Sequence, residues 1–273
     1  MLNNIVTSSG VAVQINGWED IYALQEHRTI FRQPFHGIEE IDGYQCLSVH
    51  YINGSTPGIT GYLPPSELGI EDATRKDMTR LLNMQNVPVQ VMDIIRKNNI
   101  VVLSRQKAVS RLKRRFWNNA SPGEEVEGIV LTPARPNKPL LLEVEGMEIE
   151  VPADELYWEQ WMHSVELQQR FPLYKMIRAK ITELDPENKK LALSIKALKP
   201  DPWVESIPYK YKKNDVHTGT IVAPCQTGMY VRFIDGVLCI CNGITSGQPG
   251  ATLQVRIKKI NTKKKRIYGV VNR

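Results

Sequence analysis

The chain has 273 residues, a formal net charge of +6, and 42% hydrophobic and 23% charged residues. This composition can bury cores, and the length fits one large domain or two to three small ones. There is no run of about 18 apolar residues, which excludes a membrane-spanning helix. The opening MLNNIVTSSG lacks the charged and apolar regions of a signal peptide, so we expect a cytoplasmic protein.

The charge is spread unevenly along the chain. Lys and Arg minus Asp and Glu gives +2 for residues 1–119, −4 for 120–200 and +8 for 201–273. A basic C-terminal part indicates contact with a polyanion, although a solubilising surface would have the same composition.

Residues 1–29 resemble no other part of the chain. Within them VAVQI alternates like a strand, and GWEDIYALQEHR is expected to form a helix. An N-terminal cap and a partner-binding arm both remain open for this extension.

Three later segments share one pattern, in which alternating apolar residues flank a polar turn. They are residues 91–107, 181–196 and 256–271, and each predicts a β-hairpin. The apolar positions align, with Val91 corresponding to Ile181 and Ile257. A hairpin that recurs at domain-sized intervals predicts tandem domains rather than a solenoid.

A second pattern precedes the first two hairpins, in GITGYLPPSELG and GMEIEVPADEL. Ser66 and Asp154 are placed to cap helices over residues 72–84 and 154–170. The second helix would carry Tyr157, Trp161 and Val165 on one face. In the third unit a short loop, residues 244–252, replaces the helix.

Each unit therefore has three strands, a variable insert and a closing hairpin. This is the pattern of a five-stranded OB-type barrel, so the fold class is all-β with helical inserts and three tandem barrels. We place the units at residues 30–110, 122–198 and 199–273, with a basic linker helix at 111–121.

The chain shows no sign of catalysis or of a bound cofactor. There is no GxxxxGK[ST], GxGxxG, HExxH or GxSxG motif, and we expect no enzyme activity. The cysteines form no CxxC pair and lie near no histidine at zinc-finger spacing, so we expect no metal. Cys239 and Cys241 are two residues apart and should share one strand face.

These patterns resemble the RNA-binding repeat of bacterial ribosomal protein S-one. The family shows V-x-G-x-V, G-x-F-V and G-x-x-G-F/L-V-P/H-x-S-E-L segments before its closing hairpin. The third unit matches at Val216, Gly219, Ile221, Gly228, Tyr230 and Val231. The first matches at Gly58, Gly61, Tyr62, Ser66, Glu67, Leu68, Leu103 and Ser104. The second matches at Val126, Gly128, Val130, Asp185, Lys190, Leu193 and Ser194.

The resemblance implies that RNA lies across the second and third strands, where two aromatic positions stack on bases. In the third unit Tyr230 takes the first position, Arg232 shares its face, and Phe233 should point into the core. The second aromatic position falls near Cys239 or Ile240 and is lost. Expected phosphate contacts are Lys210, Lys212, Lys213, Lys258, Lys259, Lys264 and Arg266, although the KKKR turn also fits a solvated tip.

The first unit keeps Tyr62 at the second aromatic position. In its second strand, YQCLSVHY, we expect Ser48 and His50 to face outward as polar residues of the RNA face. Leu47 and Val49 should face inward.

The second unit departs from the family pattern, because Leu141 and Glu150 replace the two aromatic residues. Glu143, Glu145 and Glu148 lie nearby and would repel phosphate, so we expect this unit to be a spacer or a protein-contact module. Tyr230→Ala should then weaken RNA binding, and Glu143→Ala should not.

In the stretch between the first two units, residues 104–116 should form a helix with Val109, Leu112 and Phe116 inward, and residues 118–123 should break it. Its Arg and Lys residues fit either a nucleic-acid contact or a solvated surface.

We therefore expect a single-stranded RNA-binding protein of S-one-type repeats, with a translation-related role on ribosome or messenger RNA. The alternative is an adaptor that docks proteins such as RNA polymerase, with RNA binding secondary.

Overall fold

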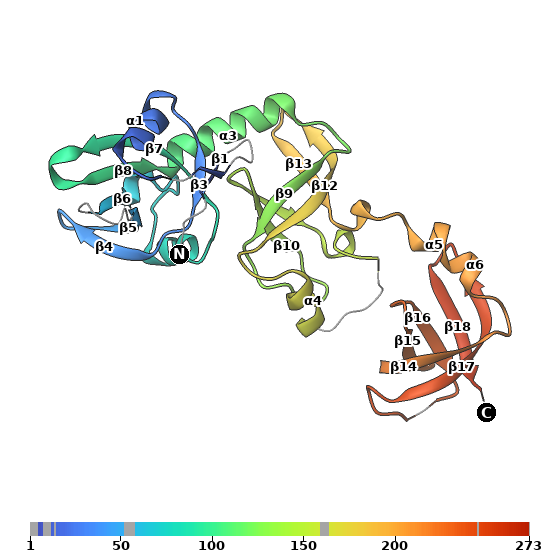
Figure 1. Ribbon diagram of the computed structural model, residues 1–273. Coiled ribbons are helices and arrows are strands. Elements are labelled where there is room, and N and C mark those ends of the chain that lie inside the picture. The colour runs from blue at the N-terminus through green and yellow to red at the C-terminus, as the bar shows by residue number, and fades with distance from the viewer. Residues whose placement is uncertain are drawn as a thin grey trace.

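The computed structural model describes residues 5–7, 12–13, 15–51, 58–158, 164–244 and 246–272. Three mostly β units follow one another along the molecule, and a long helix runs along one side of the first two (Figure 1). The all-β prediction with helical inserts is confirmed.

The first unit holds eight strands in the order β2-β1-β3-β7-β8-β6-β5-β4. Its strands are β1 (Ile5–Thr7), β2 (Ala12–Val13), β3 (Phe31–Gln33), β4 (Gly37–Ile41), β5 (Tyr44–Tyr51), β6 (Ile59–Leu63), β7 (Val87–Ile95) and β8 (Ile100–Ser104). Strand β3 pairs with β7, and β4, which follows β3 closely in the chain, pairs with β5. Together β3 and β4 act as one strand that nearly closes a five-stranded ring with β7, β8, β6 and β5. Its helices are α1 (Trp18–Glu26) and α2 (Arg75–Leu82), with 3₁₀ turns η1 (Pro65–Glu67) and η2 (Arg96–Asn98).

The second unit is a five-stranded sheet in the order β11-β10-β9-β12-β13. Its strands are β9 (Glu125–Val130), β10 (Leu140–Val144), β11 (Met147–Val151), β12 (Met176–Asp185) and β13 (Lys190–Ser194). The same unit contains η3 (Ala153–Glu155), α4 (Ser164–Arg170) and η4 (Lys196–Leu198). No ladder joins β11 to β13 among the described strands, but the two strands contact each other, so this sheet is a nearly closed ring.

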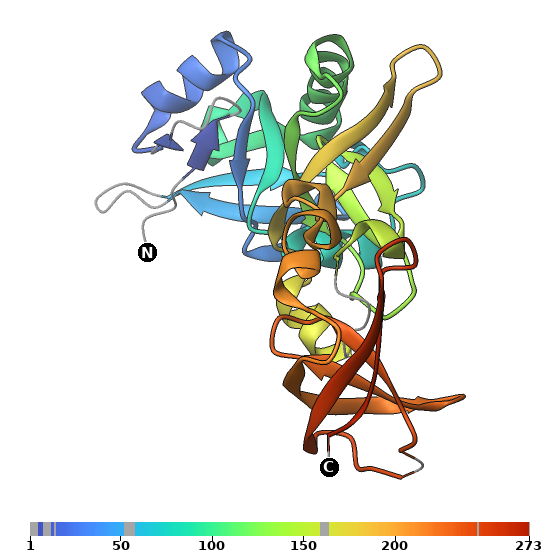
Figure 2. The same cartoon turned by 90° about the vertical axis from the view of Figure 1, so that its right-hand side faces the viewer.

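The third unit is a closed barrel in the order β14-β15-β16-β18-β17. Its strands are β14 (Val216–Cys225), β15 (Gly228–Phe233), β16 (Leu238–Asn242), β17 (Thr252–Asn261) and β18 (Arg266–Val271). Two short helices that the sequence reading missed, α5 (Pro202–Glu205) and α6 (Ile207–Lys210), precede it (Figure 2). The third unit is thus a closed barrel, and the first two units are rings that nearly close.

The three hairpins repeat in atomic detail as well as in sequence. Each first strand carries a β-bulge directly after the aligned apolar residue, at Val91, Ile181 and Ile257. Each turn ends on a residue in the left-handed region, at Asn99 (φ 53°), Lys189 (φ 52°) and Lys265 (φ 49°). A bulge bends a strand and increases its twist, so the repeat preserves the curvature that a barrel needs.

Two of the predicted helices differ from the structure. Ser66 lies inside the short turn η1, and α2 begins later, with Thr74 and Asp77 forming its capping box. In the second unit the stretch over residues 153–158 is a short turn rather than a helix. Val165 of α4 is 65% exposed, so the proposed apolar stripe is wrong there, and Trp161 lies outside the described residues.

The inward positions of the strands build three cores, and one of them crosses between units. Ile129 and Leu131 of the second unit belong to the core of the first. Phe116, near the end of the long helix, belongs to the core of the second unit. Cys239 and Cys241 are both buried in the third core, and all four cysteines are free.

Candidate nucleic-acid interface

Strand β15 alternates strictly between the core and the outer face. Val231 and Phe233 are buried, as predicted for Phe233, while Tyr230 and Arg232 are half-buried on the opposite face. The alternation follows from the period of two in a strand. Gly228 begins the strand where a Cβ atom would lie 2.0 Å from the carbonyl oxygen of Cys241, so only glycine fits there.

An outer row of side chains crosses the barrel next to Tyr230. Tyr230 pairs with Ile240 on β16, which pairs with Tyr268 on β18, which pairs with Lys259 on β17. Tyr230, Ile240 and Tyr268 are half-buried, and Lys259 is exposed. The barrel therefore carries two tyrosines on either side of an apolar residue, with an ammonium group at the end of the row.

Tyr268 was missed in the sequence. Its outward position follows from the alternation of RIYGVV, in which Ile267 and Gly269 are buried. Its place beside Ile240 depends on the parallel pairing of β16 with β18, which only the fold supplies. The aromatic position thought to be lost near Ile240 is thus occupied from a different strand.

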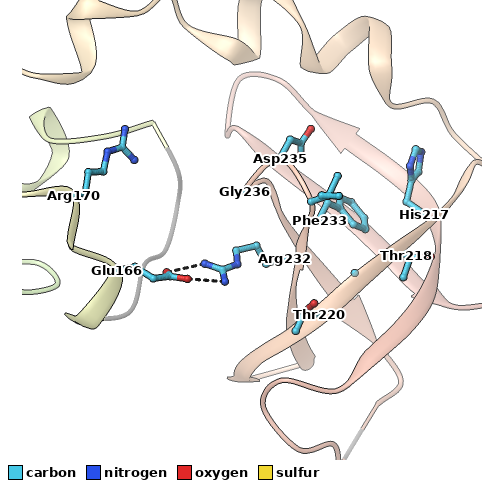
Figure 3. A pocket seen from close by; sticks show the side chains of 11 residues that line it. Glu166, Arg170, His217, Thr218, Thr220, Arg232, Phe233, Asp235 and Gly236 are labelled. Atoms are coloured by element: carbon cyan, nitrogen blue, oxygen red, sulfur yellow. Dashed lines mark hydrogen bonds and ion pairs between the residues drawn. The ribbon is translucent and has the colours of Figure 1, made fainter. Parts of the chain in front are cut away.

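Arg232 takes part in a contact between the second and third units. Its guanidinium donates two hydrogen bonds to the Glu166 carboxylate on α4, at 2.8 and 2.9 Å (Figure 3). These hydrogen bonds raise the pKa of Arg232 above its ordinary value. The pair borders a cleft of about 840 Å³ between the two units, which Arg170 and His217 also line. A phosphate bound at Arg232 must compete with Glu166.

The predicted basic residues of the third unit fall into two groups. Five lysines are exposed and form no ion pair in the described part of the chain, namely Lys212, Lys213, Lys258, Lys259 and Lys264. Arg266 is also exposed. Lys210, in contrast, forms an ion pair with Asp235 at 2.9 Å. Burial acts to raise the pKa of Asp235, but hydrogen bonds from Lys210 and Tyr211 outweigh it, and the pKa lies below its ordinary value.

The tip of the β17–β18 hairpin is partly an interdomain contact. Lys265 forms an ion pair with Asp201 at 2.7 Å and lies 4.6 Å from the ring centroid of Trp158 in the second unit. Lys263 and Lys264 remain exposed. Lys265 therefore holds the hairpin against the second unit, a role that differs from both the predicted phosphate contact and the predicted solvated tip.

The corresponding face of the first unit contains a carboxylate. Tyr62 donates a hydrogen bond to Glu39 at 2.8 Å, and His50 lies 3.1 Å from the other oxygen of Glu39. The neighbouring Ser48 hydroxyl, together with the hydrogen bond from Tyr62, holds the pKa of the Glu39 carboxyl below its ordinary value. Leu47 and Val49 lie in the core and Ser48 shares the opposite strand face with His50, as predicted, but the Ser48 side chain is fully buried whereas His50 is exposed.

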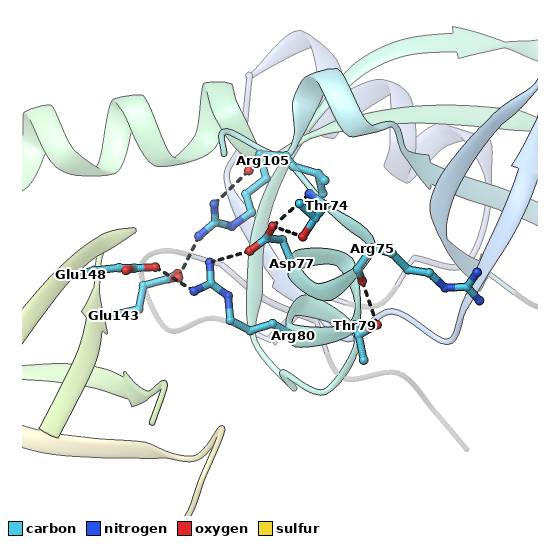
Figure 4. Close-up of polar contacts among 9 residues, drawn as sticks. Thr74, Arg75, Asp77, Thr79, Arg80, Arg105, Glu143 and Glu148 are labelled. Atoms are coloured by element: carbon cyan, nitrogen blue, oxygen red, sulfur yellow. Dashed lines mark hydrogen bonds and ion pairs between the residues drawn. The ribbon is translucent and has the colours of Figure 1, made fainter. Parts of the chain in front are cut away.

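The acidic strands of the second unit lie against the first unit at Glu143 and Glu145, whereas Glu148 and Glu150 are exposed. Glu143, Glu145 and Glu148 each form an ion pair with an arginine of the first unit or the long helix, and Figure 4 shows the pairs of Glu143 and Glu148. The pairs are Glu143–Arg105 at 2.9 Å, Glu145–Arg32 at 2.9 Å and Glu148–Arg80 at 2.8 Å. Leu141, at the first aromatic position, packs against the core of the first unit. This part of the face is an internal interface.

Glu143 and Arg105 are the most buried of these charges, with both side chains 4% exposed. Arg105 also donates to the carbonyl oxygen of Leu68 at 2.9 Å. The substitution Glu143→Ala is therefore unsuitable as a neutral control for RNA binding, because it leaves the buried guanidinium of Arg105 without its counter-charge.

The long helix α3 (Arg105–Asn119) begins at the cap Ser104, and Val109, Leu112 and Phe116 face inward as predicted.

Within the described residues no group of three or more His, Cys, Asp or Glu could hold a metal ion. In the same residues no helix is long and apolar enough to cross a membrane.

Comparison with known proteins gives distant relatives, and no family model matches the chain. The chain is 22% identical over 237 residues to small ribosomal subunit protein bS1 of Mycobacterium tuberculosis, covering 85% of the chain and 45% of the relative. It is 26% identical over 187 residues to a bS1 homolog of Bacillus cereus, covering 66% and 46%. It is 28% identical over 143 residues to 4-hydroxy-3-methylbut-2-enyl diphosphate reductase of Clostridium acetobutylicum, covering 50% and 21%.

The chain thus spans less than half the length of each of these curated relatives. Among solved structures, a multidomain protein with nucleic acid binding domains from Streptococcus pneumoniae covers 90% of this chain and 74% of its own. The identity is 11% and the TM-score 0.22, which is too low to support an argument.

Proposed function

We propose that this protein binds single-stranded RNA through the third unit, on the outer face formed by β15, β16 and β18. The units would be OB-type repeats like those of ribosomal protein S-one, as the distant bS1 relatives suggest. The observation that carries the proposal is the row Tyr230, Ile240 and Tyr268, bordered by Lys259. Tyrosine rings stack on bases of any sequence, and lysines neutralise the phosphates between them.

The first unit is a weaker candidate for the same role. Its Tyr62 hydroxyl and His50 ring both contact Glu39, so a carboxylate lies where a phosphate would pass. We propose that Tyr62 and His50 contribute less to RNA binding than the third unit does. The second unit contributes nothing through its equivalent face, because the first unit covers part of it and its glutamates repel phosphate.

The adaptor alternative relied on a free acidic face in the second unit. Part of that face contacts the first unit, and docking of a partner such as RNA polymerase stays a prediction. A translation-related setting, with ribosome or messenger RNA as partner, is proposed on the printed names of the bS1 relatives alone. We propose no catalytic activity and no cofactor, and a cytoplasmic location stays a prediction.

The test is binding of the full chain to a labelled 12-nucleotide single strand, followed by fluorescence anisotropy. Tyr230→Ala should weaken binding about ten-fold or more, since each stacked base contributes about 1–3 kcal/mol. Tyr230→Phe keeps the ring and should bind almost as tightly as the unaltered protein. A duplex of the same sequence, whose bases are already stacked, should bind weakly. Equal affinity of Tyr230→Ala and Tyr230→Phe would reject the stacking face.

A further inference from the structure

The solvent side of α3 forms one wall of a basic groove that is remote from the tyrosine row. The other wall is the segment that leads from α1 to β3, which supplies His27 and Arg28. Arg111, Arg114 and Arg115 line the groove from the helix, together with Asn118. Its volume is about 430 Å³. The sequence identified the helix cations, but only the fold brings residues 27–28 against them.

Arg111 is held in place by acceptors at the base of the groove. Its Nη1 donates to Gln90 Oε1 at 3.0 Å and to the carbonyl oxygen of Arg28. Gln90 is 8% exposed, so the guanidinium is anchored to a side chain that hardly moves. An anchored guanidinium loses little conformational entropy when it binds an anion, and its remaining N–H groups are available as donors.

The groove has an uncompensated positive charge. Among the described residues that line it, none carries a carboxylate. In the described part of the chain, Arg28, Arg111 and Arg114 form no ion pair with Asp or Glu, in contrast to Arg32, Arg80 and Arg105 nearby. Arg115 also borders a neighbouring hollow that contains Glu124 and Glu125, so its charge is partly offset.

We propose that this groove binds the phosphodiester backbone of RNA, at a second site separate from the third unit. Arginine forks match phosphate oxygens in geometry, and several neighbouring cations favour a polyanion over a single ion. The lining has amide, imidazole and guanidinium donors but no Tyr, Trp or Phe ring, so it offers contacts mainly to the backbone. The site should therefore bind RNA without regard to base identity.

The groove and the tyrosine row lie in different parts of the molecule, because α3 runs along the first two units and β15 belongs to the third (Figure 1). A strand long enough to reach both sites would bind each with the advantage of a high effective concentration. A short strand would use only one site. The inference extends the proposed function, and each site can fail without the other.

The experiment uses the full chain and a 20-nucleotide sugar-phosphate strand without bases, next to a 20-nucleotide uridine strand. The variant is Arg28→Asn with Arg114→Gln, in which Asn suits the left-handed backbone of Arg28 (φ 50°). Its affinity for the abasic strand should fall about ten-fold at low salt. The slope of log K against log salt should become shallower by about 1.4, since each lost single-strand phosphate contact contributes about 0.7.

The matched control is Lys138→Gln with Lys189→Asn, which removes the same charge at exposed positions and again places Asn on a left-handed residue (φ 52°). It should retain the affinity and the slope, and circular dichroism should show that both variants fold. An equal loss in the control would overturn the site, as would an unchanged slope in the groove variant.

Two further experiments distinguish failure of the tyrosine row from failure of the groove. Tyr230→Ala with Tyr268→Ala should weaken uridine-strand binding and leave abasic-strand binding intact. If it changes neither while the groove variant still loses affinity, the groove stands and the proposed function of the third unit falls. If poly-glutamate of matched charge binds the unaltered protein more tightly than the abasic strand does, the groove takes an acidic polypeptide and the inference is overturned.

Discussion

The second and third units present equivalent strand pairs, β10–β11 and β15–β16, to different surroundings. On β10–β11 the outer residues are glutamates and Leu141, and the first unit contacts them through three ion pairs. On β15–β16 they include Tyr230 and Ile240, and this row remains accessible. Among the outer residues of β15, Arg232 is tied to a neighbouring unit through Glu166.

The difference shows how one barrel face serves two purposes. Carboxylates that repel phosphate are matched by arginines of a neighbouring unit, so the face becomes an internal joint. Half-buried tyrosines leave the face available for an external partner. The predictions below test each side of this contrast, beginning with the largest expected effect.

Removing Glu143 should damage the joint between the first two units. Glu143→Ala leaves Arg105 buried without its counter-charge, which costs about 3–5 kcal/mol of unfolding free energy. Urea denaturation followed by circular dichroism measures the loss. Glu148→Ala is the control, because its pair with Arg80 is more exposed and should cost less than about 1 kcal/mol. Equal losses would show that burial of the Glu143 pair does not matter.

Removing the second tyrosine of the third unit should weaken RNA binding and leave the joint intact. Tyr268→Ala should cost about 1–3 kcal/mol of binding free energy, because one stacking surface is lost. Fluorescence anisotropy with a labelled single strand measures the change. Tyr209→Ala removes a tyrosine that is 76% exposed on α6 and should bind normally. If both variants bind alike, the cross-strand row is not the contact surface.

The capping box of α2 should support the joint in a pH-dependent way. Asp77 accepts hydrogen bonds from the Thr74 hydroxyl at 2.7 Å and backbone N–H at 3.0 Å, and they lower the pKa of its carboxyl below its ordinary value. Arg80, which pairs with Glu148, lies on the same helix 3.9 Å from Asp77.

Because the folded pKa of Asp77 is depressed, its stabilisation is complete above the unfolded pKa of about 3.9 and disappears as pH falls through the folded value. Thr74→Ala should cost about 1 kcal/mol at neutral pH. The difference from the unaltered protein should shrink below about pH 4. Urea unfolding across this pH range is the measurement, and a constant difference would contradict the role of Asp77.

Breaking the contact between the second and third units should slightly strengthen RNA binding. Glu166→Gln frees Arg232 for phosphate, and because the pair is partly exposed we expect a gain of about two- to five-fold. Titration with a labelled strand at low salt measures it. Glu183→Gln removes an exposed carboxylate from another part of the second unit and should have little effect. A loss of affinity in Glu166→Gln would mean that Arg232 acts only as an interdomain tether.

Features that depend only on the local sequence pattern were predicted correctly. The alignment of Val91, Ile181 and Ile257 located three hairpins whose bulges fall at the same place. Phe233 was correctly assigned to the core, because strand alternation depends on nearest neighbours in sequence. The apolar stripe predicted on residues 154–170 failed at Val165, which is exposed, because helical spacing alone does not show that a residue is packed.

Residues whose role depends on a distant partner were missed. Tyr268 joins the row of Tyr230 only through the β16–β18 pairing, and Glu143 finds Arg105 only because the first two units pack together.

The sequence by itself determined the repeated unit, its alternating strands and the positions that face inward, since these follow from local periodicity and turn chemistry. The tertiary structure alone decided which outer faces are covered and which remain open. That choice depends on pairings between charges and apolar groups far apart in the chain, whose free energy is gained only when the units come into contact.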